Sequence, residues 1–287
     1  MEPANFLAGE MSAAVFFIVL FAALCHAVWN AIVKAGDDPT VTAILVALAG
    51  AIISLVVLPF LAQPAEASWP FLAISTVLQV AYYLLVGSAY RAADMSRVYP
   101  LMRGTAPLIV AVVTAFALGD HLSAAAWIGV ALVSGGVIAT ALASRGSGDM
   151  RGTVLAIVNA LVIAAYTVSD GLGVRASASP VAYTMWLTVL TALPLVVYAA
   201  KTRPEFARHA LANAPIAFVG GALTLTSYGL ALWAMTVAPV AVVAALRETS
   251  ILFGTAIAGI VLKERIPAAR LAAIAVIAAG AIALRLA

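Results

Sequence analysis

Residues 39–65 read PTVTAILVALAGAIISLVVLPFLAQPA and contain no charged side chain. The stretch is longer than the ~20 apolar residues that a helix needs to cross the hydrocarbon core of a bilayer. Only 9% of the whole chain is charged, against roughly 25% in soluble domains, and 65% is hydrophobic. The chain is therefore expected to be an integral membrane protein. Further charge-free stretches occur at 11–33, 67–90, 121–144, 152–169 and 176–200.

Ten membrane-spanning helices account for nearly the whole sequence. Three further apolar runs carry sparse charges, and the longest of them is divided at Ala238-Pro239. A β-barrel is excluded because the runs are long and do not alternate apolar and polar residues. The expected fold is all-α and integral to the membrane, with transmembrane helices at about 13–33, 40–62, 70–90, 97–118, 124–143, 152–174, 180–200, 212–236, 240–262 and 267–286.

Lysine and arginine are distributed unevenly between the two sides that these helices define. The loops after the first, third, fifth, seventh and ninth helices hold eleven of them, whereas the opposite side holds only Arg175 and Arg285. Because cytoplasmic loops are enriched in Lys and Arg, both chain termini are predicted to lie outside the cytoplasm. The eleven basic residues are Lys34, Arg91, Arg97, Arg145, Arg151, Lys201, Arg203, Arg208, Lys263, Arg265 and Arg270.

The two halves of the chain align with each other, and the predicted units are 1–145 and 146–287. Each half holds five helices, an odd number, so the second half is expected to cross the membrane upside down relative to the first. Inverted repeats of this kind build secondary transporters, with the substrate site near the midplane between the halves. A constant shift of 144 residues aligns Arg103 with Arg247, Thr105 with Thr249, Leu118 with Leu262 and Gly136 with Gly280.

Three stretches of the sequence carry a family resemblance. They resemble the two duplicated modules of the EamA family, which belongs to the drug/metabolite transporter superfamily. Asp120 departs from the family pattern, where glutamate is more usual, and Pro267 follows the corresponding turn of the second half. The resemblance implies a ten-helix exporter of small metabolites, including amino acids as in the YddG type, in a bacterial inner membrane. The stretches are HAVWNAIVKAG (26–36), YPLMRGTAPLIVAVVTAFALGDHLSAAAWIGVALVSGGVI (99–138) and LRETSILFGTAIAGIVLKERIPAARLAAIAVIAAGAI (246–282).

Two of the expected helices carry ionic side chains deep in the membrane: Arg103 in 97–118, and Arg247 beside Glu248 in 240–262. An unpaired charge at the bilayer centre costs roughly 2.5–3.5 kcal/mol on insertion scales, so each side chain needs a partner or a wet cavity. Either arginine would snorkel to a surface, pair with a neighbouring helix or bind a substrate carboxylate. Glu248 would pair with another helix, hold a substrate ammonium or carry a proton.

Polar and aromatic side chains form stripes on several helices. In 13–33, His26, Trp29 and Asn30 fall at i, i+3 and i+4 and share one face. The stripes indicate a cavity formed by the first, third, fourth, sixth, eighth and ninth helices, although a helix contact is the simpler reading of each side chain. Ser227 lies on the eighth helix. The candidate substrate-binding residues are His26, Trp29, Asn30, Gln79, Tyr82, Tyr83, Tyr99, Arg103, Asn159, Tyr166, Tyr228, Arg247 and Glu248, and the candidate proton-coupling residues are Glu248, Asp170 and His26.

The sequence offers little support for an enzyme. It contains no HExxH, GxSxG or Walker A motif, and its single cysteine, Cys25, excludes an internal disulfide and a cysteine-cluster metal site. No metal, cofactor, ATPase subunit or nucleic-acid partner is expected; the expected partners are a small-molecule substrate and the lipid bilayer. The favoured function is export of an amino acid with an apolar or aromatic side chain by alternating access. The alternatives are a multidrug exporter of lipophilic cations, a membrane-embedded lipid enzyme and a channel.

Overall fold

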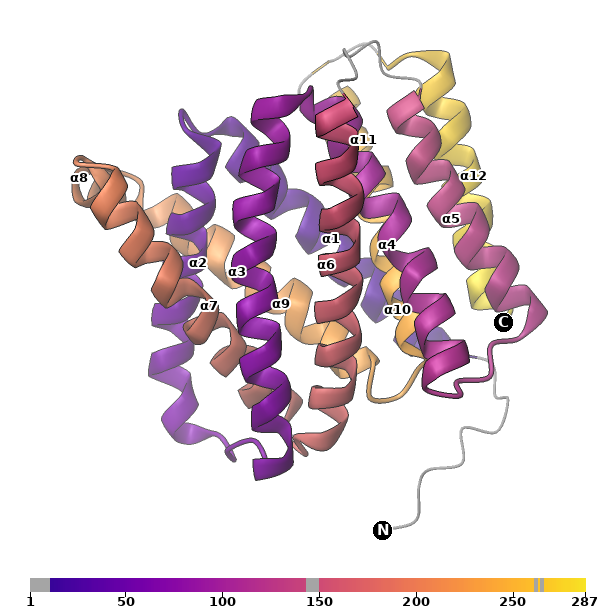
Figure 1. Cartoon of the computed structure of the whole chain (residues 1–287), viewed down its shortest axis with the longest axis horizontal. Helices are drawn as coiled ribbons and strands as arrows, with labels where there is room; N and C mark the ends of the chain where they lie inside the picture. Colours follow the sequence, from indigo (N-terminus) through magenta and orange to yellow (C-terminus); the bar gives the residue numbers. More distant parts are fainter. Residues whose placement is uncertain (1–10, 143–149, 261–262, 264–265) are drawn as a thin grey trace.

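The structure is a computed structural model that describes residues 11–142, 150–260, 263 and 266–287. Within these ranges the chain forms helices and no strands, and ten helical spans are long and apolar enough to cross a membrane. Figure 1 shows the spans side by side in one bundle, with consecutive spans running in opposite directions. The elements are α1 (Ala13–Ala35), α2 (Pro39–Val57), η1 (Leu58–Phe60), η2 (Glu66–Ser68), α3 (Trp69–Ala92), α4 (Met95–Ala117), α5 (Ala124–Leu142), α6 (Met150–Ala176), α7 (Pro180–Thr202), α8 (Phe206–Ala212), α9 (Ala214–Ala234), α10 (Val240–Arg247), α11 (Ser250–Ile260) and α12 (Ala268–Arg285).

The ten expected spans are confirmed, each within a few residues of its expected bounds. Two features differ from the expectation. The ninth span is not one continuous helix but two, α10 and α11, separated by Glu248 and Thr249. A short helix, α8, precedes the eighth span. Arg145, Leu262, Glu264, Arg265 and the boundary between the two predicted units lie outside the described residues.

The start of α2 shows how the short connections are fixed. The Asp38 carboxylate accepts hydrogen bonds from the backbone N–H groups of Thr40 and Val41, and Pro39 occupies the first helical position. Both are usual signals at a helix N-terminus, because they satisfy or remove amide donors that have no partner within the helix. Asp38 also pairs with Arg203 at the end of α7, with Nη2 and Oδ2 3.4 Å apart. The turn between α1 and α2 is thereby tied to a second helix pair.

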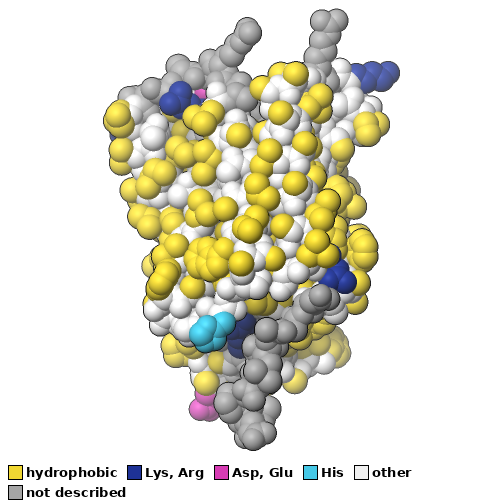
Figure 2. All heavy atoms as spheres, turned by 90° about the vertical axis from the view of Figure 1, so that its right-hand side faces the viewer, with side chains coloured by type: hydrophobic (Ala, Val, Ile, Leu, Met, Phe, Trp, Pro, Cys, Tyr) yellow, Lys and Arg dark blue, Asp and Glu magenta, His cyan; other side chains and the backbone are white. Residues whose placement is uncertain are grey.

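Helices α5 and α12 pack closely at one edge of the bundle, because glycine removes the side chain where they meet. A Cβ at Gly136 would lie 2.6 Å from Ile277 Cγ1 and 3.0 Å from the Ala273 carbonyl oxygen. A Cβ at Gly280 would lie 2.7 Å from the Val133 amide nitrogen. Small residues allow such close backbone approach between membrane helices. On the flank that these helices form, Figure 2 shows hydrophobic side chains over most of the height of the bundle.

One end of the bundle, called the terminal end here, is filled with apolar side chains. Arg285 Nη1 donates a hydrogen bond to the Met11 carbonyl at this end, at 2.9 Å, and Figure 1 shows the C-terminus here. The apolar cluster joins parts of α1, α3, α4, α5, α6, α7, α9, α10 and α12. Its fully or almost fully buried members include Val19, Val110, Met235, Val243, Leu246 and Leu284.

The opposite end, called the basic end here, holds the turns that follow α1, α3 and α7 and the start of α12 (Figure 1). It is named after the basic residues that lie in or beside these turns. They are Lys34, Arg91, Arg97, Lys201, Arg203, Arg208 and Arg270. The two ends of the protein are therefore chemically different, and they also differ in packing, since the terminal end is filled and the basic end is hollow.

Candidate substrate cavity

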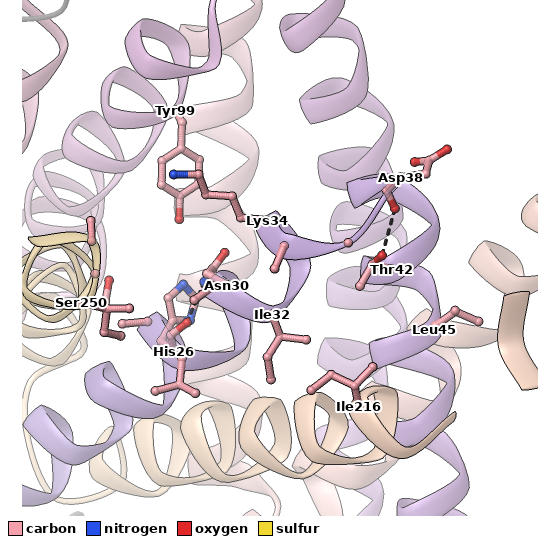
Figure 3. A pocket seen from close by; sticks show the side chains of 18 of the residues that line it. His26, Asn30, Ile32, Lys34, Asp38, Thr42, Leu45, Tyr99, Ile216 and Ser250 are labelled. Atoms are coloured by element: carbon pink, nitrogen blue, oxygen red, sulfur yellow. Dashed lines mark hydrogen bonds between the residues drawn. The ribbon is translucent and has the colours of Figure 1, made fainter. Parts of the chain in front are cut away.

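A cavity of about 910 Å³ extends from the middle of the bundle to the basic end. Its wall comes from α1, α2, α4, α9 and α11, and residues of α5, α8 and α12 complete the mouth. Figure 3 shows His26, Asn30, Tyr99 and Ser250 near one another, with Asp38, Thr42, Leu45 and Ile216 on the other side. The cavity is therefore enclosed by parts of both halves of the chain.

The polarity of the lining changes with depth. The formally charged lining residues, Lys34, Asp37, Asp38 and Arg270, all belong to the basic end. Farther in, the wall is mostly aliphatic, with polar groups from His26, Asn30, Tyr99 and Ser250. Such a wall, mainly apolar with a few convergent polar groups, is typical of a small-molecule site.

Two neighbours on α1 hold His26 in place. Asn30 Nδ2 donates to the His26 carbonyl at 2.8 Å, and the Trp29 indole N–H donates to His26 Nδ1 at 3.3 Å. The Trp29 and His26 rings also meet edge to face, with centroids 5.1 Å apart. The helical stripe expected on α1 is thus present: His26 and Asn30 line the cavity, while Trp29 contacts His26.

Arg103 of α4 and Glu248 form a buried ion pair at the inner end of the cavity. Arg103 Nη2 lies 2.6 Å from Glu248 Oε1, and Arg103 Nε donates to Glu248 Oε2 at 3.0 Å. Only 7% and 5% of the two side chains are exposed. Of the alternatives open for these residues, the structure shows pairing between helices, with the two-contact geometry in which a guanidinium fits a carboxylate.

Arg103, Arg247 and Glu248, which were predicted as substrate-binding residues, do not line the large cavity in this conformation. They line a separate void of about 10 Å³, roughly the space of one water molecule. Tyr166 and Thr167 of α6 line the same void. The ion pair accounts for their position outside the large cavity, because it joins α4 to the ninth span where these residues were expected to meet a substrate.

The chain around Glu248 leaves the α-helical pattern. The Glu248 N–H donates to the Ala245 carbonyl and the Thr249 N–H to the Leu246 carbonyl, each at 3.0 Å and three residues back. Such tightened turns inside a span mark hinges or functional sites. Across the ion pair, Pro107 in α4 has no N–H to donate to the Arg103 carbonyl. Both partners of the pair therefore sit at irregular points of their helices.

Asp170 of α6 lies in a second buried polar network, outside the cavity. Gln79 of α3, Tyr183 of α7 and Tyr228 of α9 all donate hydrogen bonds to its carboxylate, with Gln79 at 3.2 Å and Tyr183 at 3.1 Å. The Arg247 guanidinium lies over the Tyr228 ring, 4.9 Å from its centroid. Gln79 and Tyr228 were expected to bind the substrate, and Asp170 was a candidate proton-coupling residue. In the structure these three side chains and Tyr183 connect four helices, because the inner face of each helix also meets its neighbours.

The remaining candidates also pack between helices. Tyr82 stands edge to face against both Tyr83 and Tyr166, with centroid distances of 5.3 and 5.9 Å. The Asn159 amide contacts the Met102 sulfur at 2.9 Å. None of these four predicted residues, Tyr82, Tyr83, Tyr166 and Asn159, lines the large cavity, and neither the third nor the sixth span does.

Sequence reasoning missed several lining residues, including Lys34, Asp38, Thr42, Ser250 and Arg270. Lys34 had a signal, because it continues the His26 and Asn30 stripe at i+8. Ser250 had none, since its position depends on the break in the ninth span. The second span was not expected to contribute at all, because it carries no inward polar stripe.

The sequence and the fold were compared with those of known proteins. Residues 150–286 match the EamA-like transporter family. A solved structure titled "Crystal structure of protein" has the same fold, with a TM-score of 0.73 over 95% of this chain and 96% of that chain, at 18% sequence identity. A search of curated proteins found no match. The chain therefore carries a domain of the EamA-like transporter family, and its ten membrane-capable helices fit a multi-pass transporter of the drug/metabolite transporter superfamily.

Proposed function

We propose that the protein is a secondary transporter that exports amino acids with apolar or aromatic side chains across a bacterial inner membrane. The observation that carries the proposal is the asymmetry of the bundle. A cavity of about 910 Å³ is continuous with the basic end, and an apolar cluster fills the terminal end. This is the arrangement expected of one state of an alternating-access carrier.

The positive-inside rule supports the direction of the open cavity. Lys and Arg gather at the end where the cavity reaches the surface, which supports the proposal that this end is cytoplasmic and that both termini lie outside the cytoplasm. In this state the cavity would receive a solute from the cytoplasm. Release on the other side requires the apolar cluster to open.

The helix contacts support an inverted repeat of residues 1–145 and 146–287. The third span packs on the sixth, α3 on α6, as its counterpart the eighth span packs on the first, α9 on α1. The second and seventh spans, α2 and α7, pack on each other, as do the fifth and tenth, α5 and α12. An exchange of the two halves therefore reproduces these contacts, which is what alternation between two opposed states needs.

The cavity suits a small solute with an apolar part. Its volume lies within the ~300–1,000 Å³ range of small-molecule sites, and its inner wall combines aliphatic groups with His26, Asn30, Tyr99 and Ser250. Among the proposed proton-coupling residues, His26 lines the cavity, whereas Glu248 is paired and Asp170 is hydrogen-bonded. A cycle that couples to protons would have His26 as its accessible site.

A counterflow assay in proteoliposomes tests the proposal. Vesicles loaded with an unlabelled amino acid should take up the same labelled amino acid against its gradient, with phenylalanine and leucine faster than lysine or aspartate. Uptake of lipophilic cations without any amino acid would favour the multidrug alternative, which the aliphatic wall also suits. Chemical turnover of lipid without solute movement would indicate an enzyme, and flux too fast for a carrier cycle would indicate a channel.

A further inference from the structure

We propose that the Arg103–Glu248 ion pair is an exchangeable gate at the inner end of the cavity, and that it selects zwitterions. In this gate the carboxylate of the substrate takes the place of Glu248 on Arg103, while its ammonium group takes the place of Arg103 on Glu248. The inference rests on the proposed function and names its substrate class: small solutes that carry a positive and a negative charge close together.

The position of the pair separates two spaces. Tyr99 lines the large cavity one helical turn before Arg103, and Ser250 lines it two residues after Glu248. On the other side, Pro107 and Val110, farther along α4, line the water-sized void. The pair therefore stands between the cavity and the packed terminal end. A solute that moves inward from the cavity meets these two side chains first.

The energetic argument concerns what happens when the pair separates. Both side chains are more than nine-tenths buried, and the void that they share has room for about one water molecule, so bulk water cannot replace a lost partner. Breaking such a pair leaves two uncompensated charges in a medium of low polarity, which is strongly unfavourable. A zwitterion supplies both missing partners at once. A cation supplies only a partner for Glu248, and an anion only a partner for Arg103.

The charge balance around the pair points to the same class. Arg247 lies over the Tyr228 ring, and the Tyr228 hydroxyl donates to Asp170. The described charges of this layer are thus Arg103 and Arg247, two positive, and Glu248 and Asp170, two negative, with a formal sum of zero. Entry of a zwitterion keeps the sum at zero. Entry of a net cation or anion places an extra charge in the membrane interior.

The local backbone permits the exchange. Glu248 lies between α10 and α11, where hydrogen bonds run three residues back instead of four. Arg103 precedes Pro107 by one turn, at a carbonyl that the proline leaves without its usual helical donor. Helices bend at such points. The two charged groups can therefore move apart without the loss of a regular helical turn.

The test compares three probes that share one aromatic side chain: L-phenylalanine as the zwitterion, phenylalaninamide as a cation and N-acetylphenylalanine as an anion. Wild-type protein in proteoliposomes is expected to transport phenylalanine at least tenfold faster than either analogue. R103Q should reduce that preference over the amide, and E248Q should reduce it over the N-acetyl compound. R203Q, which removes the exposed partner of Asp38, is the matched control and should keep the wild-type order.

The double variant R103Q/E248Q keeps the test decisive even if a single variant fails to fold, because it leaves neither charge unpaired. In this variant the ratio of the transport rate of phenylalanine to that of each analogue is expected to fall at least fivefold. A folded double variant with the wild-type order of the three probes would overturn the gate. Wild-type protein that transports none of these probes would instead contradict the proposed function, so the two failures can be told apart.

Discussion

The molecule contains the same guanidinium–carboxylate pairing in two settings. Arg103 and Glu248 approach to 2.6 Å with 7% and 5% of their side chains exposed, whereas Arg203 and Asp38 lie 3.4 Å apart with 52% and 36% exposed. At the rim, water replaces either partner when the other leaves, so the pair adds little. In the middle of the bundle no such replacement exists. The burial of a pair, and not its chemistry, therefore decides how much its charges matter for the stability of this protein.

The largest expected effect comes from breaking the buried pair on one side. E248Q leaves the Arg103 guanidinium without its carboxylate, and it should lower the free energy of unfolding by about 3–5 kcal/mol. R103Q/E248Q should recover most of that loss, because no unpaired charge remains. Thermal unfolding in detergent, followed by tryptophan fluorescence, measures both. If E248Q is as stable as the wild type, burial does not make the Arg103–Glu248 pair more important for stability than the exposed Arg203–Asp38 pair.

A second buried carboxylate, Asp170, differs from Glu248 because the side chains of Gln79, Tyr183 and Tyr228, which donate hydrogen bonds to it, are neutral. Y183F removes the donor at 3.1 Å from a fully buried acceptor, so we expect a loss of about 1.5–3 kcal/mol in the free energy of unfolding. Y198F lies on the same helix, at a side chain that is 48% exposed, and should cost almost nothing. Equal melting temperatures for the two variants would contradict the importance of the network.

A change in packing shows how much stability comes from helix contact alone. G136A places a methyl group 2.6 Å from Ile277 Cγ1 and 3.0 Å from a backbone oxygen, and it should destabilise by about 1–3 kcal/mol. G135A, the adjacent position, meets nothing within 4 Å and is the matched control. The yield of monodisperse protein and its melting temperature report the difference. A melting temperature for G136A no lower than that of G135A would show that α5 and α12 separate easily.

The smallest effect is expected at the rim. R203Q should change the free energy of unfolding by less than about 1 kcal/mol, and less still at high salt, because the exposed pair is screened. Melting curves at low and high ionic strength check this. A loss as large as that of E248Q would place the turn between α1 and α2 among the elements on which the fold depends.

The spans could be predicted because a long charge-free run such as 39–65 has few other stable structures. The site could be predicted only in part. The stripe of His26 and Asn30 identified an inner face, and both residues line the cavity. The same reasoning failed for Gln79 and Tyr228, because helical periodicity separates inner from outer faces but does not tell a hollow inner surface from a packed one.

The division of the ninth span could not be predicted. Breaks usually coincide with proline or glycine, but residues 241–253 contain neither. The ion pair was one of several alternatives for Arg103 and Glu248. A charge inside a membrane requires a partner, but the sequence does not show which residue that partner is. The proximity of two side chains whose sequence positions differ by 145 is information that no local pattern contains.

The tightened turns at Glu248 also determine how the ninth span can move. All eight residues of α10 are buried, most of them in the apolar cluster, whereas α11 supplies Ser250, Gly254 and Ala258 to the cavity wall. A change of the angle between α10 and α11 strains only the short turn that joins them, and both helices keep their internal backbone hydrogen bonds. One transmembrane segment can thus stay anchored in the plug at one membrane face while its other piece swings to reshape the vestibule at the opposite face.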